Sequence, residues 1–153
     1  VLMDTSADPE PAAPRFKYAL MAAAVRWVGY GPVYGGAEQV LFGRSFLRDP
    51  ARAELRAEWR ARITAQDRTG VANAANGVFS RAGVAERLGD IHVPTLVAVG
   101  EEDTATPPFH AGRIATGIAG SRLARIPGAG HSPPIENPDA VTRLLRDFWD
   151  GLA

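Results

Sequence analysis

The feature that most constrains how this chain folds is a continuous apolar run, Val93-Pro94-Thr95-Leu96-Val97-Ala98-Val99-Gly100, which starts beside a proline and ends in glycine. A short run of this kind is typical of a strand buried on both faces of a parallel sheet. Downstream, the sequence indicates a helix after Pro107-Pro108, a second strand over Arg122–Ile126 and an amphipathic helix that begins at Asn137-Pro138. The order strand–helix–strand–helix predicts an α/β fold with parallel strands and helices packed outside them.

The residues before this run have a different pattern. Val1-Leu2-Met3 is typical of a buried strand, and the stretch that follows is rich in proline and acidic residues, as loops are. Apolar residues then recur at helical spacing, with candidate helices over residues 33–47 and 71–88. We therefore expect three parts: a core strand and linker over residues 1–14, a helical cap or lid over residues 15–88, and a strand–helix–strand–helix core over residues 89–153.

Charge and composition exclude several classes of function. Lys+Arg and Asp+Glu are both 17 and no basic stripe is visible, so we expect neither nucleic acid nor an acidic membrane surface as partner. The chain has no cysteine, which excludes disulfides and cysteine-based metal sites and is compatible with a cytoplasmic location. The apolar stretch from Ala19 to Val28 is interrupted by Arg26 and is too short to span a bilayer. His92 and His110 lack neighbours at metal-ligand spacing, so we expect no metal and no cofactor.

Two loops could carry chemistry, because functional residues of parallel sheets gather at the carboxyl ends of the strands. Asp103 lies in the acidic loop after the apolar strand, and His131 lies in a glycine-rich loop after the second strand. If these strands are adjacent, both loops lie at one edge and the two side chains can meet. A carboxylate that accepts from an imidazole N–H fixes its tautomer and stabilises the imidazolium that forms during proton transfer. Taken singly, Asp103 also fits a turn or a helix cap, and His131 an ordinary loop residue.

These blocks resemble the C-terminal signature of the α/β-hydrolases, and the branch that contains enol-lactonases and esterases is especially similar. The resemblance implies a partial α/β-hydrolase fold: the last three parallel core strands with flanking helices, plus a helical cap. The residues that carry it are Val93 to Asp103, Ile126-Pro127-Gly128-Ala129-Gly130-His131, Glu136-Asn137-Pro138 and the opening Val1-Leu2-Met3-Asp4-Thr5-Ser6-Ala7.

The same resemblance implies roles for individual residues. Asp103 matches the acid and His131 the histidine of a catalytic triad, whose order in this fold is Ser, acid, His. Asp4 is the alternative acid, because some relatives, haloalkane dehalogenases among them, carry the acid after the earlier strand. Trp27 and Tyr30 in the cap are candidate substrate-binding residues, although aromatic side chains at such positions also serve as ordinary core. The implied substrate is a small-molecule ester or lactone.

The triad serine has no match in the sequence. The nucleophile elbow of the fold reads G-x-S-x-G, and no serine of the chain is flanked by glycines at both required positions. Such a catalytic domain routinely needs about 200 residues or more, so roughly the first five strands also find no counterpart. We therefore expect the chain to be inactive on its own and to require an N-terminal half of the same fold.

Two other functions stay open at this point. A hydrolase of the same fold could cleave a C–C bond or act as a dehalogenase, which an Asp in place of Ser at the elbow would indicate. The chain could also be a non-catalytic fragment, or a half-module that pairs with a separate N-terminal half. The coding sequence upstream of Val1 distinguishes these functions, because it either contains a G-x-S-x-G frame or does not.

Overall fold

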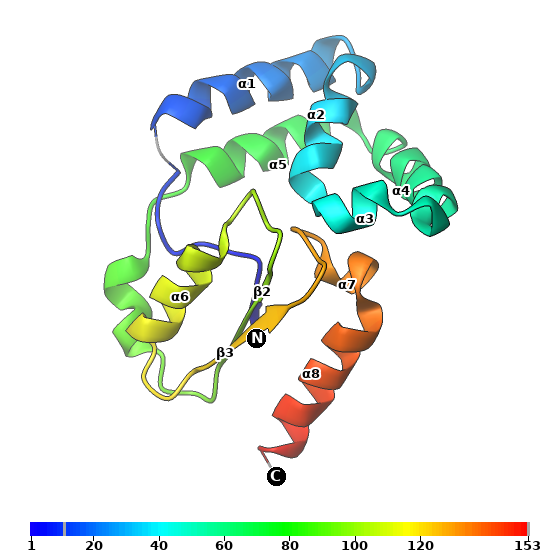
Figure 1. Ribbon diagram of the computed structural model, residues 1–153. Helices are drawn as coiled ribbons and strands as arrows, with labels where there is room; N and C mark the ends of the chain where they lie inside the picture. The colour runs from blue at the N-terminus through cyan, green and yellow to red at the C-terminus, as the bar shows by residue number, and fades with distance from the viewer. Residues whose placement is uncertain (11, 153) are drawn as a thin grey trace. The chain divides into compact units, whose positions relative to one another are not determined.

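A computed structural model describes residues 1–10 and 12–152 of the chain (Figure 1). The chain divides into two compact units, and each is described by itself. The first, which we call the core unit, comprises Val1–Ala7, Gln39–Arg48 and Val84–Ala153. The second, which we call the helical unit, comprises Asp8–Glu38 and Asp49–Gly83.

A three-stranded parallel sheet lies in the core unit. Its strands are β1 (Leu2–Met3), β2 (Leu96–Gly100) and β3 (Arg122–Ile126), in the order β1-β2-β3. In this register Val97 pairs with Leu2 on one side and with Leu123 on the other. All five residues of β2 are buried, because it is the central strand and helices cover both of its faces. The predicted α/β fold with three parallel strands is confirmed, and the apolar run of the sequence is its central strand.

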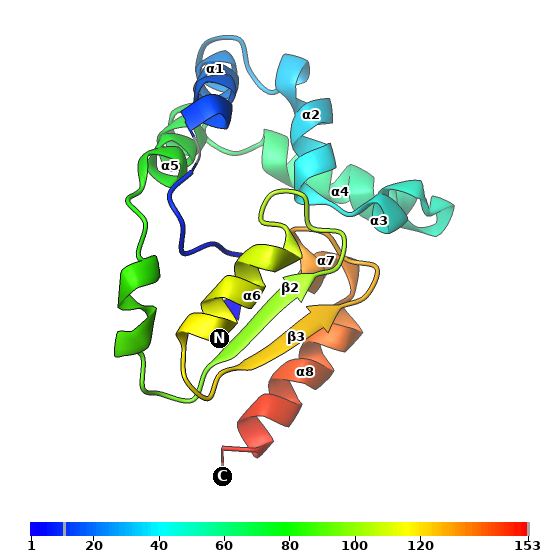
Figure 2. The ribbon, with the colours of Figure 1, turned by 60° about the vertical axis from the view of Figure 1, so that its left-hand side comes forward.

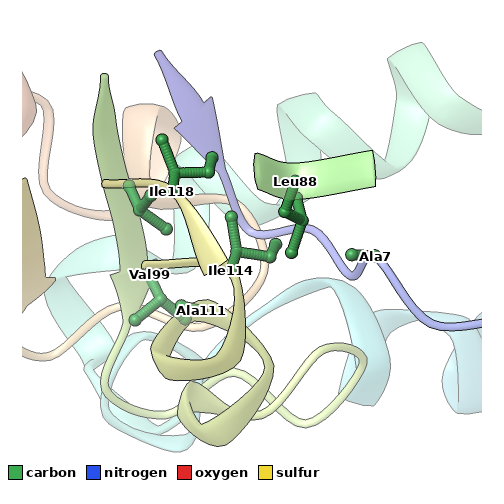
Figure 3. Close-up of a cluster of buried hydrophobic side chains, with 7 residues drawn as sticks. Ala7, Leu88, Val99, Ala111, Ile114 and Ile118 are labelled. Atoms are coloured by element: carbon green, nitrogen blue, oxygen red, sulfur yellow. The ribbon is translucent and has the colours of Figure 1, made fainter. Parts of the chain in front are cut away.

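One face of the sheet is covered by α6 (Pro108–Gly117), as Figure 2 shows. Val97 and Val99 point to this face and pack against Ile114 and Ile118. Leu88 closes the same cluster from a 3₁₀ helix at Ala85–Asp90 (Figure 3). Burial of an aliphatic side chain of this size stabilises a fold by about 1.5–3 kcal/mol. The cluster therefore fixes α6, and with it the loop that joins β2 to α6.

The other face is covered by α8 (Pro138–Asp150), which follows the short helix α7 (Pro133–Glu136). Ala98 and Ile126 point to this face and pack against Val141. The helix begins as the sequence predicts, because the Asn137 side chain accepts a hydrogen bond of 3.2 Å from the N–H of Ala140. The amphipathic stripe of α8 thus lies on the sheet.

The helical unit contains the long helices α1 (Ala12–Trp27), α4 (Ala53–Thr64) and α5 (Arg68–Ser80). α1 and α5 lie side by side, and the rings of Tyr18 and Phe79 stack between them with centroids 4.3 Å apart. Among the described residues, no helix of the chain combines the length and the apolar character that a membrane crossing requires.

Two predicted helices differ from the structure, because one is broken in two and the other ends early. The helix expected over residues 33–47 is α2 (Gly31–Leu41) followed by α3 (Arg44–Arg48), with a break at Gly43. The reason is that the N–H of Gly43 donates to the Glu136 carboxylate instead of to a helical carbonyl. The helix expected over residues 71–88 stops at Ser80, because Arg81 is extended.

Candidate active site

Two loops extend from the carboxyl ends of β2 and β3, and they contact each other directly. The N–H of Glu102 in the first loop donates to the carbonyl of Ala129 in the second at 2.8 Å. A Cβ atom on Gly100 would collide with the carbonyl oxygens of Ala129 and Gly130. Glycine at position 100 is therefore what allows the two loops to approach this closely.

Asp103 and His131 meet at this edge of the sheet. The Nδ1 atom of His131 lies 2.9 Å from Oδ2 of Asp103. Asp103 is buried, with only 3% of its surface exposed. Asp103 also accepts hydrogen bonds from the N–H of Ala105 at 2.8 Å, the N–H of Thr106 at 3.0 Å and the hydroxyl of Thr106 at 2.8 Å. Burial acts to raise the pKa of Asp103, but the hydrogen bonds from His131 and Thr106 outweigh it and hold the pKa below its ordinary value.

The same contact sets the state of the imidazole. Because the Asp103 carboxylate is an acceptor, Nδ1 of His131 carries a proton, and Nε2 of the neutral ring carries the lone pair. The hydrogen bond to Asp103 raises the pKa of His131, and burial opposes this rise only in part. A base with this tautomer can take a proton at Nε2 and hold it as an imidazolium beside the carboxylate.

The loop that carries His131 is held by a second buried acid, Glu136, which is 3% exposed. Its carboxylate accepts from the N–H groups of Gly130 and Ser132, the two neighbours of His131, each at 2.9 Å. It also accepts from the N–H of Gly43 at 2.7 Å. Glu136 thus fixes the backbone on both sides of His131.

Asp4 is the third titratable residue of the group. It follows β1 and adopts a φ of 45°, a left-handed conformation that non-glycine residues rarely adopt. Its Oδ1 accepts from the N–H of Gly100 at 2.8 Å. Burial raises the pKa of Asp4 to about 7, against the opposing hydrogen bond from Gly100. Of the two candidate acids, Asp103 is the one whose carboxylate contacts the imidazole of His131.

The donor atoms of Asp4, Asp103 and His131 lie within 4.8 Å of one another, a spacing that could admit a cation. The pair of Asp103 and His131 is however at direct hydrogen-bond distance, 2.9 Å, which accounts for their contact without an ion. We therefore treat the group as a hydrogen-bonded acid–base cluster.

The two predicted substrate-binding residues belong to the helical unit. Trp27 ends α1 and is 78% exposed. Tyr30 is 8% exposed, and its hydroxyl donates to the carbonyl of Gln66 at 3.1 Å. Neither position tests the predicted role, which stays a prediction.

Several residues of the core unit were not singled out by the sequence reasoning. Glu136 lies in the Glu136-Asn137-Pro138 motif, but the sequence predicts no chemical role for it, and no sequence pattern distinguishes Thr106 from other loop residues. His110, for which the sequence predicts no metal-binding role, has its Nδ1 atom 3.0 Å from the hydroxyl of Ser6. The signal that could have identified Glu136 is an acid placed shortly after a glycine-rich turn, where unpaired backbone N–H groups need an acceptor.

A cavity of about 380 Å³ lies in the core unit beside the loop that carries Asp103. Glu102 and Thr104, the sequence neighbours of Asp103, form part of its wall. Its other lining residues come from α2, α3 and the turn between them: Gln39, Phe42, Arg44, Leu47 and Arg48.

Comparison with known proteins agrees with this architecture. The family model of the alpha/beta hydrolase family matches residues 1–144. A pimeloyl-acyl-carrier-protein methyl ester esterase of Neisseria meningitidis is 35% identical over 72 residues, which cover 47% of this chain and 28% of the relative. A thermophilic esterase from Thermogutta terrifontis superposes with a TM-score of 0.88 at 32% identity, over 98% of this chain and 54% of the esterase.

The enol-lactonase from Burkholderia xenovorans superposes with a TM-score of 0.84 at 24% identity, over 97% of this chain and 54% of the lactonase, and at this identity it supports the fold alone. The chain thus spans about half the length of these solved structures. The family match covers most of the chain, and the parallel sheet between α6 and α8 agrees with a partial α/β-hydrolase fold. From the match and the fold together, we conclude that this chain belongs to the alpha/beta hydrolase family.

Proposed function

We propose that this chain supplies the acid and the histidine of a serine-type hydrolase that cleaves an ester or lactone of a small molecule. The observation that carries the proposal is the 2.9 Å contact between His131 Nδ1 and Asp103 Oδ2 at the carboxyl ends of two adjacent parallel strands. The relative from Neisseria meningitidis and the structure from Thermogutta terrifontis are both esterases by name, which supports the reaction class.

In the proposed mechanism, Nε2 of His131 removes the proton of a serine hydroxyl as its oxygen attacks the substrate carbonyl. Asp103 stabilises the imidazolium that results. His131 then gives this proton to the departing alkoxide, which leaves an acyl-enzyme on the serine. A water molecule then attacks the acyl carbonyl while His131 takes its proton, and His131 returns this proton to the serine oxygen as the acid leaves.

The cavity beside the loop that carries Asp103 has a size that suits a small substrate. The cavity of about 380 Å³ next to Asp103 falls within the range of about 300–1,000 Å³ that small-molecule sites occupy. Its lining combines apolar Phe42 and Leu47 with the basic residues Arg44 and Arg48. We propose that part of the substrate or its leaving group binds there.

The nucleophile and the oxyanion hole have to come from an N-terminal half of the same fold, joined to this chain or separate from it. Within residues 1–10 and 12–152, β1 pairs with β2 alone, so its other edge offers free backbone hydrogen-bonding groups to a further strand. The esterase and the lactonase are each nearly twice as long as the segment that matches them, which supports such a half. Without it we expect no turnover.

We propose further that the helical segment, residues 15–88 of the expected division, serves as the cap and that Trp27 and Tyr30 contact the substrate from it. The exposed indole of Trp27 supports this role, since it offers an apolar face to an acyl chain. The cytoplasmic location stays a prediction that rests on the absence of cysteine.

The test starts with the coding sequence upstream of Val1, which should contain a G-x-S-x-G frame. The extended protein should hydrolyse a short-chain p-nitrophenyl ester, and the variant His131→Gln should lose about 10⁴-fold or more in kcat. Asp103→Asn should cost about 10⁴-fold, because the imidazole then adopts the wrong tautomer.

His92→Gln is the matched control, since His92 is an exposed histidine of the same chain. Ester turnover that survives His131→Gln would contradict the assigned base. An upstream frame without a nucleophile elbow would contradict the serine mechanism, and turnover by the isolated chain would contradict the need for an N-terminal half.

A further inference from the structure

Asp4 has a buried carboxylate oxygen that receives no hydrogen bond from the part of the chain that the structure describes. Its Oδ1 accepts from the N–H of Gly100 at 2.8 Å, whereas its Oδ2 is buried without a hydrogen bond among the described residues. The backbone of the same residue is held at a φ of 45°. Backbone strain and an unpaired buried polar atom each cost free energy, and together they suggest that the position of this side chain is required.

The neighbouring carboxylate is that of Asp103. Carboxylate oxygens of the two residues and a ring nitrogen of His131 lie within 4.8 Å of one another. Two carboxylates this close do not both ionise readily, and one of them keeps a proton. Among the described residues, Asp103 accepts four hydrogen bonds, from Ala105, Thr106 and His131, whereas Asp4 accepts one. Hydrogen bonds therefore stabilise the ionised form of Asp103 more than that of Asp4, and we place the shared proton on Asp4.

We propose that Asp4 is a positioning residue that carries a proton on Oδ2 and donates it in a hydrogen bond to the Asp103 carboxylate. The pair of Asp4 and Asp103 then presents one negative charge, rather than two, to His131. No atom is transferred, because the proton stays on Asp4 while Asp103 accepts. The consequence for His131 as a base rests on the proposed function, whereas the protonated carboxyl is a property of this chain alone.

The expected titration agrees with this arrangement. Burial raises the pKa of Asp4 to about 7, the hydrogen bond from Gly100 opposes the rise, and the charge of Asp103 adds to it. The charged groups that act on Asp4 are Asp103 and His131, and those that act on His131 are Asp103, Asp4 and Glu136. When Asp4 loses its proton near neutral pH, its new charge therefore favours the imidazolium.

The sign of the effect on stability follows from linkage. The pKa of Asp4 is 3.8 as an ordinary aspartate and about 7 in the fold, so the folded chain binds more protons than the unfolded chain between these values. The contribution of Asp4 to stability is complete below pH 3.8 and is lost as the pH rises through about 7.

The test uses the purified chain and the variant Asp4→Asn. Asparagine tolerates a positive φ, its carbonyl can accept from Gly100, and its amide can donate to Asp103 at every pH. In the parent chain, the side-chain carboxyl carbon of Asp4, followed by ¹³C NMR, should titrate near pH 7. In Asp4→Asn, the pKa of His131 should be lower, and the loss of Tm between pH 5 and pH 8 should be smaller than in the parent.

Asp4→Asn removes the titratable group but keeps the hydrogen bonds, whereas Asp4→Ala removes both. We therefore expect Asp4→Ala, but not Asp4→Asn, to lower Tm at pH 5. The exposed Asp147→Asn is the control and should change neither the pKa of His131 nor the pH dependence of Tm. An Asp4 carboxyl that titrates below pH 5 would overturn the inference, and this measurement on the parent chain requires no variant to fold. Absence of ester turnover in the extended protein, with the Asp4 titration near pH 7 intact, would instead refute the proposed function alone.

Discussion

Glu136 and Gly43 are 93 residues apart in the chain, yet the Glu136 carboxylate accepts a hydrogen bond of 2.7 Å from the N–H of Gly43. The same carboxylate binds the backbone on both sides of His131. The turn at Gly43 between α2 and α3 and the loop that carries His131 are thus both hydrogen-bonded to the buried Glu136 carboxylate. Four predictions follow from the bonds and contacts around this edge of the sheet.

Replacement of Glu136 by Ala should lower the free energy of unfolding by roughly 3 kcal/mol, because the buried N–H groups of Gly43, Gly130 and Ser132 lose a charged acceptor. Urea unfolding followed by circular dichroism measures this change. Glu101→Ala, at an exposed position of the loop after β2, is the control and should stay within about 0.5 kcal/mol of the parent. Equal stability of the two variants would show that Glu136 does not hold the loop.

Gly130→Ala should destabilise the chain by about 3 kcal/mol, because a Cβ at this position would collide with the backbone of Gly43. Gly112 lies in α6 with open space around its missing Cβ, so Gly112→Ala should stabilise by roughly 0.5–1 kcal/mol through helix propensity. Thermal unfolding of the two variants side by side measures the contrast. Two shifts of the same sign would contradict the close approach of Gly130 to Gly43.

Thr106→Val should raise the pKa of Asp103, because the hydroxyl of Thr106 donates to the carboxylate at 2.8 Å and valine has no donor. The expected loss of stability at pH 7 is about 1–2 kcal/mol. ¹³C NMR of the carboxyl carbon and urea unfolding measure the two effects. Thr116→Val on the exposed side of α6 is the matched control, and it should leave the Asp103 titration unchanged.

Asp103→Asn should lower the pKa of His131, since the hydrogen bond to Asp103 is the main cause of its rise. A histidine with a raised folded-state pKa contributes stability fully below its ordinary 6.5 and loses it as the pH rises through the folded pKa. Asp103 has a lowered pKa, so its contribution is present above 3.8 and is lost at lower pH. The variant should therefore lose most stability between pH 3.8 and 6.5.

An NMR titration of the His131 ring together with urea unfolding at pH 5.5 and 8.5 checks this prediction. Asp147→Asn again provides the control. A destabilisation that is larger at pH 8.5 than at pH 5.5 would contradict the ion-pair character of the contact.

The sequence predicted the sheet and its main helices well, because local patterns specify them. The apolar run that became β2 and the cap at Asn137 each depend on a few adjacent residues. Helix ends that depend on distant partners were predicted less well. The break at Gly43 depends on the Glu136 carboxylate, which no local pattern reveals.

In the candidate site, too, the sequence predicts the residues that follow a local pattern and misses those whose position depends on distant segments. Asp103 and His131 could be placed at one edge because each lies in the loop that follows a strand. The position of Asp4 beside them depends on the pairing of β1 with β2, which brings the ends of distant segments together. Its φ of 45° and its unpaired oxygen have no signature in the sequence, since aspartate after a strand is common in ordinary turns.

The hydrogen bonds to Asp103 also differ in range from those around His131. Ala105 and Thr106, which provide three donors to the acid, lie within three residues of it, so these hydrogen bonds form within a single loop. The backbone around His131 is instead held by Glu136 of α7, whose carboxylate also accepts from the distant N–H of Gly43. Local opening that releases Gly43 would therefore weaken the hold of Glu136 on the backbone around His131, whereas the three donors from Ala105 and Thr106 to Asp103 lie within its own loop.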